Sequence, residues 1–334
     1  MDTGKNIRLT AAEISQLWGS YQNDTLAICM LRYFLNHVED TEIRPLLQHA
    51  LDLSQAHIPK LTAFFQEEGN AVPQGVTEDD VNESAPRLFS DTYMLMYMQQ
   101  VGKLSLNAYS VAVANATRQD LHNYFSECLR EYAELHTMAN DLLLAKGLYV
   151  RPPYIPPQES VSFVESTKFL TGWFGKRRPL LSLEISNLFE NAQRNALGVS
   201  TLIGFSQVAR SKEVTNYLIR GKEIAAKHVE IFGSILREDD LPNPMTWDSE
   251  VTKSTTPPFS DKLMTVATTG LIGIGIGYYG TSMATSMRAD INTHYVRLTG
   301  EIGKYSLDGA KLMIKNGWLE QPPMQADRDK LAKP

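Results

Sequence analysis

Ionisable residues recur at matching positions in the two halves of this sequence, and metal binding is the chemistry that they could share. Each half carries two glutamates and a histidine in the same order, namely Glu13, His57 and Glu131, and then Glu184, His228 and Glu301. Carboxylates and imidazoles that project inward from the helices of a bundle hold paired iron ions in helical di-iron proteins. These six residues are therefore the candidate metal ligands, with Asp91 and Asp261 as further repeated carboxylates.

The spacing around the histidines does not match a di-iron centre. Such a centre takes a Glu-x-x-His motif from each of two helices, which places both ligands on one face. Asp52 and Glu223 precede His57 and His228 by five residues, a separation that turns them about 140° away on a helix. We therefore expect no cofactor, with iron or manganese at an interior site as the alternative, and buried, hydrogen-bonded histidines as the structural explanation.

The sequence contains one apparent nucleotide motif, which the pattern around it excludes. Gly275 to Gly280 fits G-x-G-x-x-G, but such a loop must follow a strand and open a helix. This stretch lies inside an expected helix, so we predict that Gly273 and Gly277 allow another helix to approach closely. The same apolar stretch, 263–287, is long enough to cross a bilayer, but its counterpart in the first half contains Gln99, Gln100 and Lys103. We predict a buried helix and no membrane span.

An internal repeat determines the architecture that must position these residues. Shifting the sequence by 171 places Glu13 on Glu184 and His57 on His228, and shifting it by 170 places Glu131 on Glu301. The match extends over nearly all of each half, which is the signature of a duplicated structural unit.

Each repeat is predicted to contain four helices. Apolar residues recur at helical spacing over residues 10–38, 41–69, 89–115 and 118–146, and again over 181–209, 211–237, 259–286 and 288–316. The connections 70–88 and 238–258 are long, whereas the first and second helices of each repeat are joined by short ones. A long crossover between two helix pairs is the ferritin-like topology. We predict an all-α chain, a tandem duplication of a ferritin-like four-helix bundle.

The predicted organisation is a first bundle over residues 1–157, a linker over 158–180 and a second bundle over 181–334. The linker contains Phe169, Trp173 and Phe174 together with the basic run from Lys176 to Arg178. We expect so aromatic a linker to pack on a bundle.

Composition indicates a folded protein of a reducing compartment. The chain has two cysteines, Cys29 and Cys128, and a formal net charge of −6, so neither a disulfide framework nor a nucleic-acid footprint is indicated. The N-terminus lacks an apolar stretch after a basic start, which argues against a secretory signal. The expected location is cytoplasmic, with no nucleic-acid or membrane partner.

Several segments resemble a known family. They are RPLLSLEISNLFENAQRNALG, FSDKL and GWLEQPP in the second half, and LFSD and KGLYVRPPYIPP in the first. These segments are similar to the uncharacterised family called domain of unknown function 3231, and the likeness spans almost the whole chain. The resemblance implies tandem ferritin-like bundles, an origin in spore-forming Firmicutes and kinship with proteins similar to spore coat protein F.

The resulting functional prediction is a non-catalytic structural or interaction protein of spore-forming bacteria, associated with the spore coat. Its partners would be other proteins or further copies of itself. The alternative is a metal-binding protein or oxidoreductase with a site inside each bundle.

Overall fold

The structure is a computed structural model that describes residues 7–173 and 177–332. Phe174 and Lys176 of the predicted linker lie outside the described residues. Within these ranges the chain is all-helical, with one isolated antiparallel β-bridge between Phe89 and Val251.

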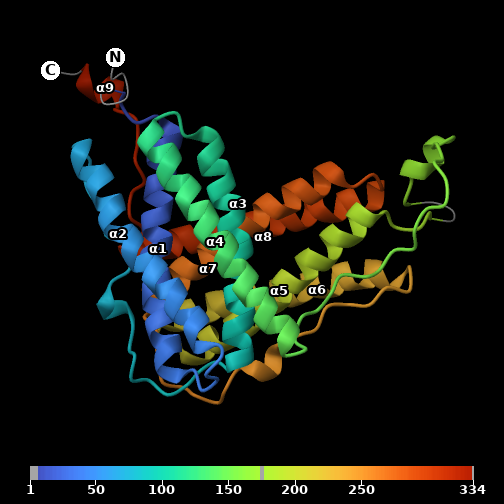
Figure 1. Ribbon diagram of the computed structural model, residues 1–334, viewed down its shortest axis with the longest axis horizontal. Helices are drawn as coiled ribbons and strands as arrows, with labels where there is room; N and C mark the ends of the chain where they lie inside the picture. Colours follow the sequence, from blue (N-terminus) through green and yellow to red (C-terminus); the bar gives the residue numbers. More distant parts are fainter. Residues whose placement is uncertain (1–6, 174–176, 333–334) are drawn as a thin grey trace. The chain divides into compact units, whose positions relative to one another are not determined.

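Four long helices occupy each half of the sequence (Figure 1). The first half holds α1 (Ala11–His37), α2 (Arg44–Glu67), α3 (Asp91–Asn115) and α4 (Gln119–Ala145), with the short helix η1 (Glu78–Asp80) in its crossover. The second half holds α5 (Ser182–Val208), α6 (Lys212–Arg237), α7 (Asp261–Thr285) and α8 (Ala289–Lys315), with η3 (Asp248–Glu250) in its crossover. The helix η2 (Thr167–Leu170) lies in the linker, and α9 (Arg328–Leu331) lies near the C-terminus.

The predicted duplication of a four-helix unit is confirmed, and the helix ends agree closely with the pattern in the sequence. The largest difference is at the start of α2, expected at residue 41 and found at Arg44. Gly147 and Gly317 follow α4 and α8 with φ angles of +67° and +69°. Glycine takes this left-handed conformation without steric cost, and it closes a helix.

The helices pack into two compact units that interleave along the sequence. The first unit comprises residues 1–83, 98–141 and 317–334, and the second comprises 84–97 and 142–316. Within the first unit, the Glu320 carboxylate accepts hydrogen bonds from Gln22 and from the backbone of Gln74 and Gly75. Within the second, the backbone N–H of Ser90 donates to the carbonyl of Glu250. The boundaries 1–157, 158–180 and 181–334 remain a prediction about the repeats.

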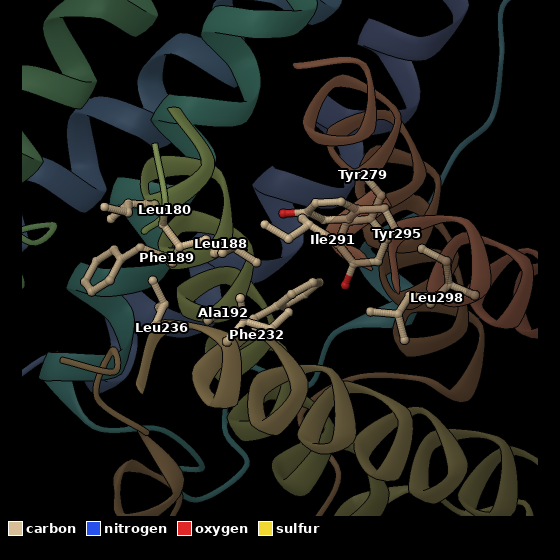
Figure 2. Packing of buried hydrophobic residues seen from close by; sticks show 13 residues of the cluster. Leu180, Leu188, Phe189, Ala192, Phe232, Leu236, Tyr279, Ile291, Tyr295 and Leu298 are labelled. Carbon is tan, nitrogen blue, oxygen red and sulfur yellow. The ribbon is translucent and has the colours of Figure 1, made fainter. Parts of the chain in front are cut away.

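The second unit has an apolar core to which all four of its long helices contribute. Figure 2 shows Phe189 and Ala192 of α5, Phe232 of α6, Tyr279 of α7 and Leu298 of α8 gathered in this core. Each of these side chains is almost completely buried. Burial of apolar surface of this kind is the dominant favourable term in folding.

Of two predictions about packing, one holds only for part of the linker and the other is wrong for the described residues. Val161, Phe163 and Trp173 of the linker are exposed, whereas Phe169 is half-buried beneath Arg178 and Leu180 is buried in the core of the second unit. A Cβ atom added at Gly273 or Gly277 would meet nothing within 4 Å, so these glycines of α7 accommodate no close neighbour.

Helix α7 combines a buried face with an exposed one. Leu263, Met264 and Tyr279 are buried, whereas Leu271 and Ile274 are exposed. Among the described residues, α7 is one helix whose length and hydropathy would suffice to cross a membrane, and 39% of its most apolar window is buried. The expectation of a buried central helix is therefore only partly met, because one face of α7 is exposed.

Candidate metal centre

His57 lies on α2 in the interior of the first unit, where three side chains that can bind protons or metals surround its ring. Its Nε2 atom lies 2.9 Å from Oε2 of Glu131 and 3.6 Å from Sγ of Cys128, both on α4. Its Nδ1 atom lies 3.3 Å from Oδ2 of Asp24 on α1, an ion-pair contact that lacks hydrogen-bond geometry. His57 and Asp24 are each 1% exposed. Three helices thus place four polar groups in one small volume.

The environment of His57 favours its charged form. Burial alone would lower the pKa of the imidazole, because it disfavours a charge. The facing Asp24 carboxylate more than offsets this effect and raises the pKa of His57 to about 11. Burial also raises the pKa of Asp24, and the facing His57 opposes that effect. In the metal-free protein, His57 is an imidazolium between two carboxylates.

Three tyrosines enclose this centre. The rings of Tyr124 and Tyr132 lie 5.9 and 6.2 Å from the imidazole, measured between centroids, and Tyr109 stacks on Tyr132 at 5.3 Å. Burial raises the pKa of all three phenols, which keeps them neutral. The aromatic wall excludes water and strengthens every electrostatic interaction inside it.

His228 occupies the corresponding place on α6 in the second unit, with different neighbours. Its Nε2 atom lies 3.1 Å from Oε2 of Glu301, as in the first unit, but its Nδ1 atom lies 2.8 Å from the hydroxyl of Tyr279. That hydroxyl accepts a hydrogen bond from Asn195. The Glu301 carboxylate can only accept, so the ring proton of the neutral His228 is on Nε2 and the Tyr279 hydroxyl donates to Nδ1.

The electrostatics of the second centre differ accordingly. Burial lowers the pKa of His228, and the single carboxylate of Glu301 does not reverse the effect. Glu301 is itself paired with Lys227 at 2.5 Å. His228 is thus a neutral hydrogen-bonded ring, of the kind expected when a histidine is buried without a strong anionic partner.

In each repeat the structure brings together two of the three predicted ligands. Glu131 and Glu301 contact the histidines, as a shared site requires. Glu13 does not, because its carboxylate accepts hydrogen bonds from the backbone of Thr117 and Arg118, where α4 begins. Arg118 precedes Glu131 by thirteen residues, which corresponds to about 20 Å along the helix.

Glu184 has the same place in the second unit as Glu13 in the first. It accepts hydrogen bonds from the backbone of Met287 and Arg288 and forms a two-fold ion pair with Arg178. A carboxylate at a helix N-terminus satisfies backbone donors and complements the helix dipole. The assignment of Glu13 and Glu184 as metal ligands is therefore wrong, since both close helix ends.

The repeated aspartates are engaged at helix starts in the same way. Asp91 pairs with Arg87 at 2.6 Å, and Asp261 accepts hydrogen bonds from the backbone of Arg210 and Ser211. Both begin the third helix of their repeat, where Asp91 pairs with a nearby side chain and Asp261 holds the backbone just before α6.

The predicted ligands did not include three residues that contact the histidines, namely Asp24, Cys128 and Tyr279. Asp24 and Cys128 align with Asn195 and Leu298, so a search for residues shared by both repeats could not find them. Tyr279 does align with a tyrosine, Tyr109, but nothing in the pattern of residues indicates a contact with His228. An acidic residue on the inward face of α1 and a thiol on the inward face of α4 are the sequence features that could have indicated this site.

The donor set around His57 has the chemistry of a metal site. Its Nε2 atom, the thiol sulfur of Cys128 and a carboxylate oxygen of Glu131 all lie within 4.8 Å of one another. Imidazole, thiolate and carboxylate are the three protein groups that bind zinc and related ions. In the second unit Leu298 replaces the thiol, so the described residues around His228 offer only an imidazole and a carboxylate already paired with Lys227.

Comparisons with known proteins identify a family and one solved structure of low similarity. A crystal structure of a candidate spore coat protein from Bacillus halodurans C-125 matches with 19% identity and a TM-score of 0.42, covering 46% of this chain and all of that one. No curated protein matches the chain. The profile of the family described as "Protein of unknown function (DUF3231)" matches twice, over residues 1–161 and 168–331. These two matches cover nearly the whole chain, which therefore belongs to the DUF3231 family.

Proposed function

We propose that this chain is a metal-binding protein in which the first unit holds one ion and the second unit holds none. The observation that carries the proposal is the convergence of His57, Cys128 and Glu131, whose ligand atoms lie within 4.8 Å of one another. His57 and Cys128 are buried, and the Glu131 side chain is 17% exposed. A site of this kind is shielded from water and keeps an approach for an ion beside the carboxylate.

The charge of the first centre supports the proposal. Asp24 and Glu131 face the two ring nitrogens of His57, so the centre gathers two carboxylates in a volume of low dielectric constant. Buried carboxylates need a compensating cation. A proton on His57 supplies one in the metal-free protein, and a divalent ion in its place would compensate more charge.

Metal analysis of the purified protein tests the proposal. Protein prepared without an affinity tag is freed of metal with a chelator, dialysed in separate samples against Zn²⁺, Co²⁺, Fe²⁺ and Mn²⁺, and then freed of unbound ions. We expect about one tightly bound ion per chain, lost in the His57→Ala variant and kept in His228→Ala, which is the matched control. Folding of each variant is checked by its helical circular dichroism. A wild-type chain that retains no ion contradicts the proposal, as does equal loss in both variants.

A second role, as an interaction protein, is favoured by the exposed linker. Between the two long helices α4 and α5, Val161 and Phe163 are 86% and 87% exposed, and Tyr154 is also largely exposed. Apolar side chains gathered on an accessible segment are typical of contact sites for other proteins. We propose that this segment contacts a protein partner or a further copy of the chain, in a structural, non-catalytic role associated with the spore coat.

Localisation tests this second role. A fluorescent fusion of the full chain is followed during sporulation, beside a Val161→Ser/Phe163→Ser variant. Enrichment of the wild-type fusion at the forming spore, reduced in the variant, is the expected result. Diffuse fluorescence of the wild type throughout sporulation would contradict it. Neither outcome bears on the metal, because both substitutions lie outside the first unit.

A further inference from the structure

The ligand set of the first unit specifies a class of metal ion as well as its presence. We propose that the centre takes a borderline, thiolate-binding ion of the Zn²⁺ class in tetrahedral coordination, with Asp24 as the residue that positions His57. This inference rests on the proposed function and deepens it. It replaces the iron or manganese that the sequence analysis gave as the alternative to having no cofactor.

The donor atoms exclude the carboxylate-rich pattern of a di-iron or di-manganese site. Such sites draw four glutamates and two histidines from the bundle, whereas Glu13 is engaged at a helix end and is absent from this centre. What remains is one nitrogen, one sulfur and one oxygen. Soft thiolate ligands select ions such as Zn²⁺, and hard oxygen sets suit manganese and magnesium.

The spacing between the nitrogen and sulfur donors agrees with tetrahedral zinc. Bond lengths of about 2.0–2.1 Å to nitrogen and about 2.3 Å to sulfur at the tetrahedral angle require a nitrogen–sulfur separation of roughly 3.6 Å. The distance from Nε2 of His57 to Sγ of Cys128 is 3.6 Å. The corresponding separation between nitrogen and oxygen is roughly 3.3 Å, and the observed distance to Glu131 is 2.9 Å. The carboxylate of Glu131 and the sulfur of Cys128 lie within 4.8 Å of each other, and tetrahedral zinc requires roughly 3.6 Å between oxygen and sulfur. Binding therefore requires the partly exposed Glu131 side chain to move away from the ring and toward the sulfur.

Asp24 is placed to orient the ring for this coordination. Metal-bound histidines almost always direct their other ring nitrogen to a carboxylate, carbonyl or water, which fixes the tautomer and ring orientation. Asp24 lies 3.3 Å from Nδ1 and is buried with the histidine. With the proton on Nδ1, the lone pair of Nε2 points toward Cys128 and Glu131. The proton that leaves Nε2 and the proton of the Cys128 thiol both pass to solvent as the ion binds.

A fourth position completes a tetrahedral ion, and one polar group is available beside it. The Tyr124 hydroxyl is buried beside the Cys128 thiol, and among the described residues it has no partner with full hydrogen-bond geometry. A buried hydroxyl without a partner is costly and rare. It is the group that would hydrogen-bond a water in the fourth position, and the corresponding residue of the second unit is His294.

Cobalt spectroscopy tests the inference on the full chain. Co²⁺ reports coordination directly, since a tetrahedral site gives intense visible d–d bands and a thiolate ligand adds a charge-transfer band in the near ultraviolet. We expect both signals on titrating metal-free protein with about one equivalent of Co²⁺, and their loss when Zn²⁺ displaces the cobalt.

Matched variants assign these signals to residues. Cys128→Ser is expected to remove the charge-transfer band, whereas Cys29→Ser, which alters the other buried cysteine, retains it. Cys128→Ala provides a second substitution should serine unfold the chain. Asp24→Asn is expected to weaken Co²⁺ binding by about 10- to 100-fold while the charge-transfer band persists at saturation, the signature of a positioning residue.

The outcomes separate this inference from the proposed function. Binding of Co²⁺ or Fe²⁺ with the weak bands of octahedral coordination, unchanged in Cys128→Ser, overturns the inference and leaves the proposed function standing. Absence of binding for Zn²⁺, Co²⁺, Fe²⁺ and Mn²⁺ alike overturns both. Loss of the charge-transfer band in Cys29→Ser together with its persistence in Cys128→Ser would also overturn the inference.

Discussion

The two units hold a histidine at the same position and give it opposite properties. The pKa of His57 is raised to about 11, and that of His228 is lowered. Both rings are buried and both contact a glutamate on the fourth helix of their repeat. The principal difference at the rings is that Asp24 faces one and Tyr279 the other. A single well-placed carboxylate thus outweighs the cost of burying a charge, and a hydroxyl does not.

The comparison also shows how a duplicated unit can lose or acquire a site without changing its fold. Asp24 and Cys128 align with Asn195 and Leu298, and Leu298 is part of the apolar core in Figure 2. Asparagine is close in volume to the aspartate that it matches, whereas leucine is clearly larger than the cysteine. The same arrangement of four helices along the sequence therefore accommodates a charged centre in one repeat and an apolar one in the other.

The largest expected effect comes from making the first centre like the second. The double variant Asp24→Asn/Cys128→Leu removes the positioning carboxylate and one ligand, so affinity for Zn²⁺ should fall by at least about 100-fold. Competition titration with a chromophoric chelator measures the change. Undiminished affinity would show that the ion binds elsewhere.

The reciprocal change should create a second site. Asn195→Asp/Leu298→Cys gives His228 the neighbours of His57, and we expect bound Zn²⁺ to rise from about one to about two ions per chain. Adding Lys227→Ala, which frees Glu301 from its ion pair, should tighten the new site. If the stoichiometry stays at one in both variants, the difference between the units does not lie in these residues.

The carboxylates at the helix ends should contribute to stability in both units, more strongly in the second. Glu184→Gln removes the negative charge that pairs with Arg178, and the Glu184 side chain is completely buried. We therefore expect a loss of about 3–5 kcal/mol in the free energy of unfolding. Glu13→Gln breaks charged hydrogen bonds without stranding a cation, and about 2–3 kcal/mol is expected. Denaturant titrations measure both. Equal metal binding in Glu13→Gln and wild type is the accompanying control.

The helix-end carboxylates predict a loss of stability in acid. Burial disfavours the charge of Glu13, but hydrogen bonds from the backbone of Thr10, Arg118 and Thr117 lower its pKa from 4.5 to about 2. A group with a lowered pKa stabilises the fold above its unfolded pKa and loses that effect as pH falls through the folded value. Between pH 4.5 and about 2, wild type should therefore lose its advantage over Glu13→Gln. A difference that is independent of pH would contradict this account.

The pKa values of the two histidines are shifted in opposite directions, so their contributions to stability in the metal-free protein should depend on pH in opposite ways. A raised pKa gives stability that is complete below the unfolded value and is lost as pH rises through the folded one, so the contribution of His57 declines between pH 6.5 and about 11. The lowered pKa of His228 makes acid destabilising below pH 6.5.

Nuclear magnetic resonance of the histidine rings measures these titrations in the presence of a chelator. At neutral pH, His57 should give the signals of an imidazolium and His228 those of a neutral ring. In Asp24→Asn the signals of His57 should shift toward the neutral form. A neutral His57 in the wild type would contradict the comparison.

The smallest effects concern the third helix of each repeat. Gly273→Ala and Gly277→Ala place a methyl group where nothing lies within 4 Å, so each should stabilise the chain by about 0.5–1 kcal/mol through helix propensity. In α3, a Cβ at Gly102 would lie 2.8 Å from Cβ of His136, and Gly102→Ala should destabilise. Thermal unfolding measures both. Destabilisation by the α7 substitutions would indicate a neighbour that covers this face.

The helices were predictable because their signals are local. Apolar spacing and the glycines at 147 and 317 lie within single segments, and the repeat supplied each segment twice. The contact between a histidine of the second helix and Glu131 or Glu301 of the fourth also followed from repetition, since these residues align. Glu13 and Glu184 align equally well, but a carboxylate is favoured at a helix N-terminus as well as at a metal ion. Repetition of a glutamate therefore does not distinguish a helix-capping role from metal binding.

What the sequence could not supply is the part that differs between the units. Asp24 and Cys128 have no ionisable counterparts, and their meeting at His57 depends on how α1, α2 and α4 pack. The exposed part of the linker was misjudged for a related reason. Aromatic residues favour burial, but burial requires a surface to receive them, and the sequence does not show whether one exists.

Anomalous X-ray scattering tests the central claim most directly. Crystals of the full chain grown with Zn²⁺ are measured at energies on either side of the zinc absorption edge, which locates each ion independently of any assumed site. We expect one strong peak bonded to Nε2 of His57, Sγ of Cys128 and a carboxylate oxygen of Glu131, and none beside His228. A peak at His228, or peaks confined to surface residues, would contradict the assignment of the metal centre to the first unit.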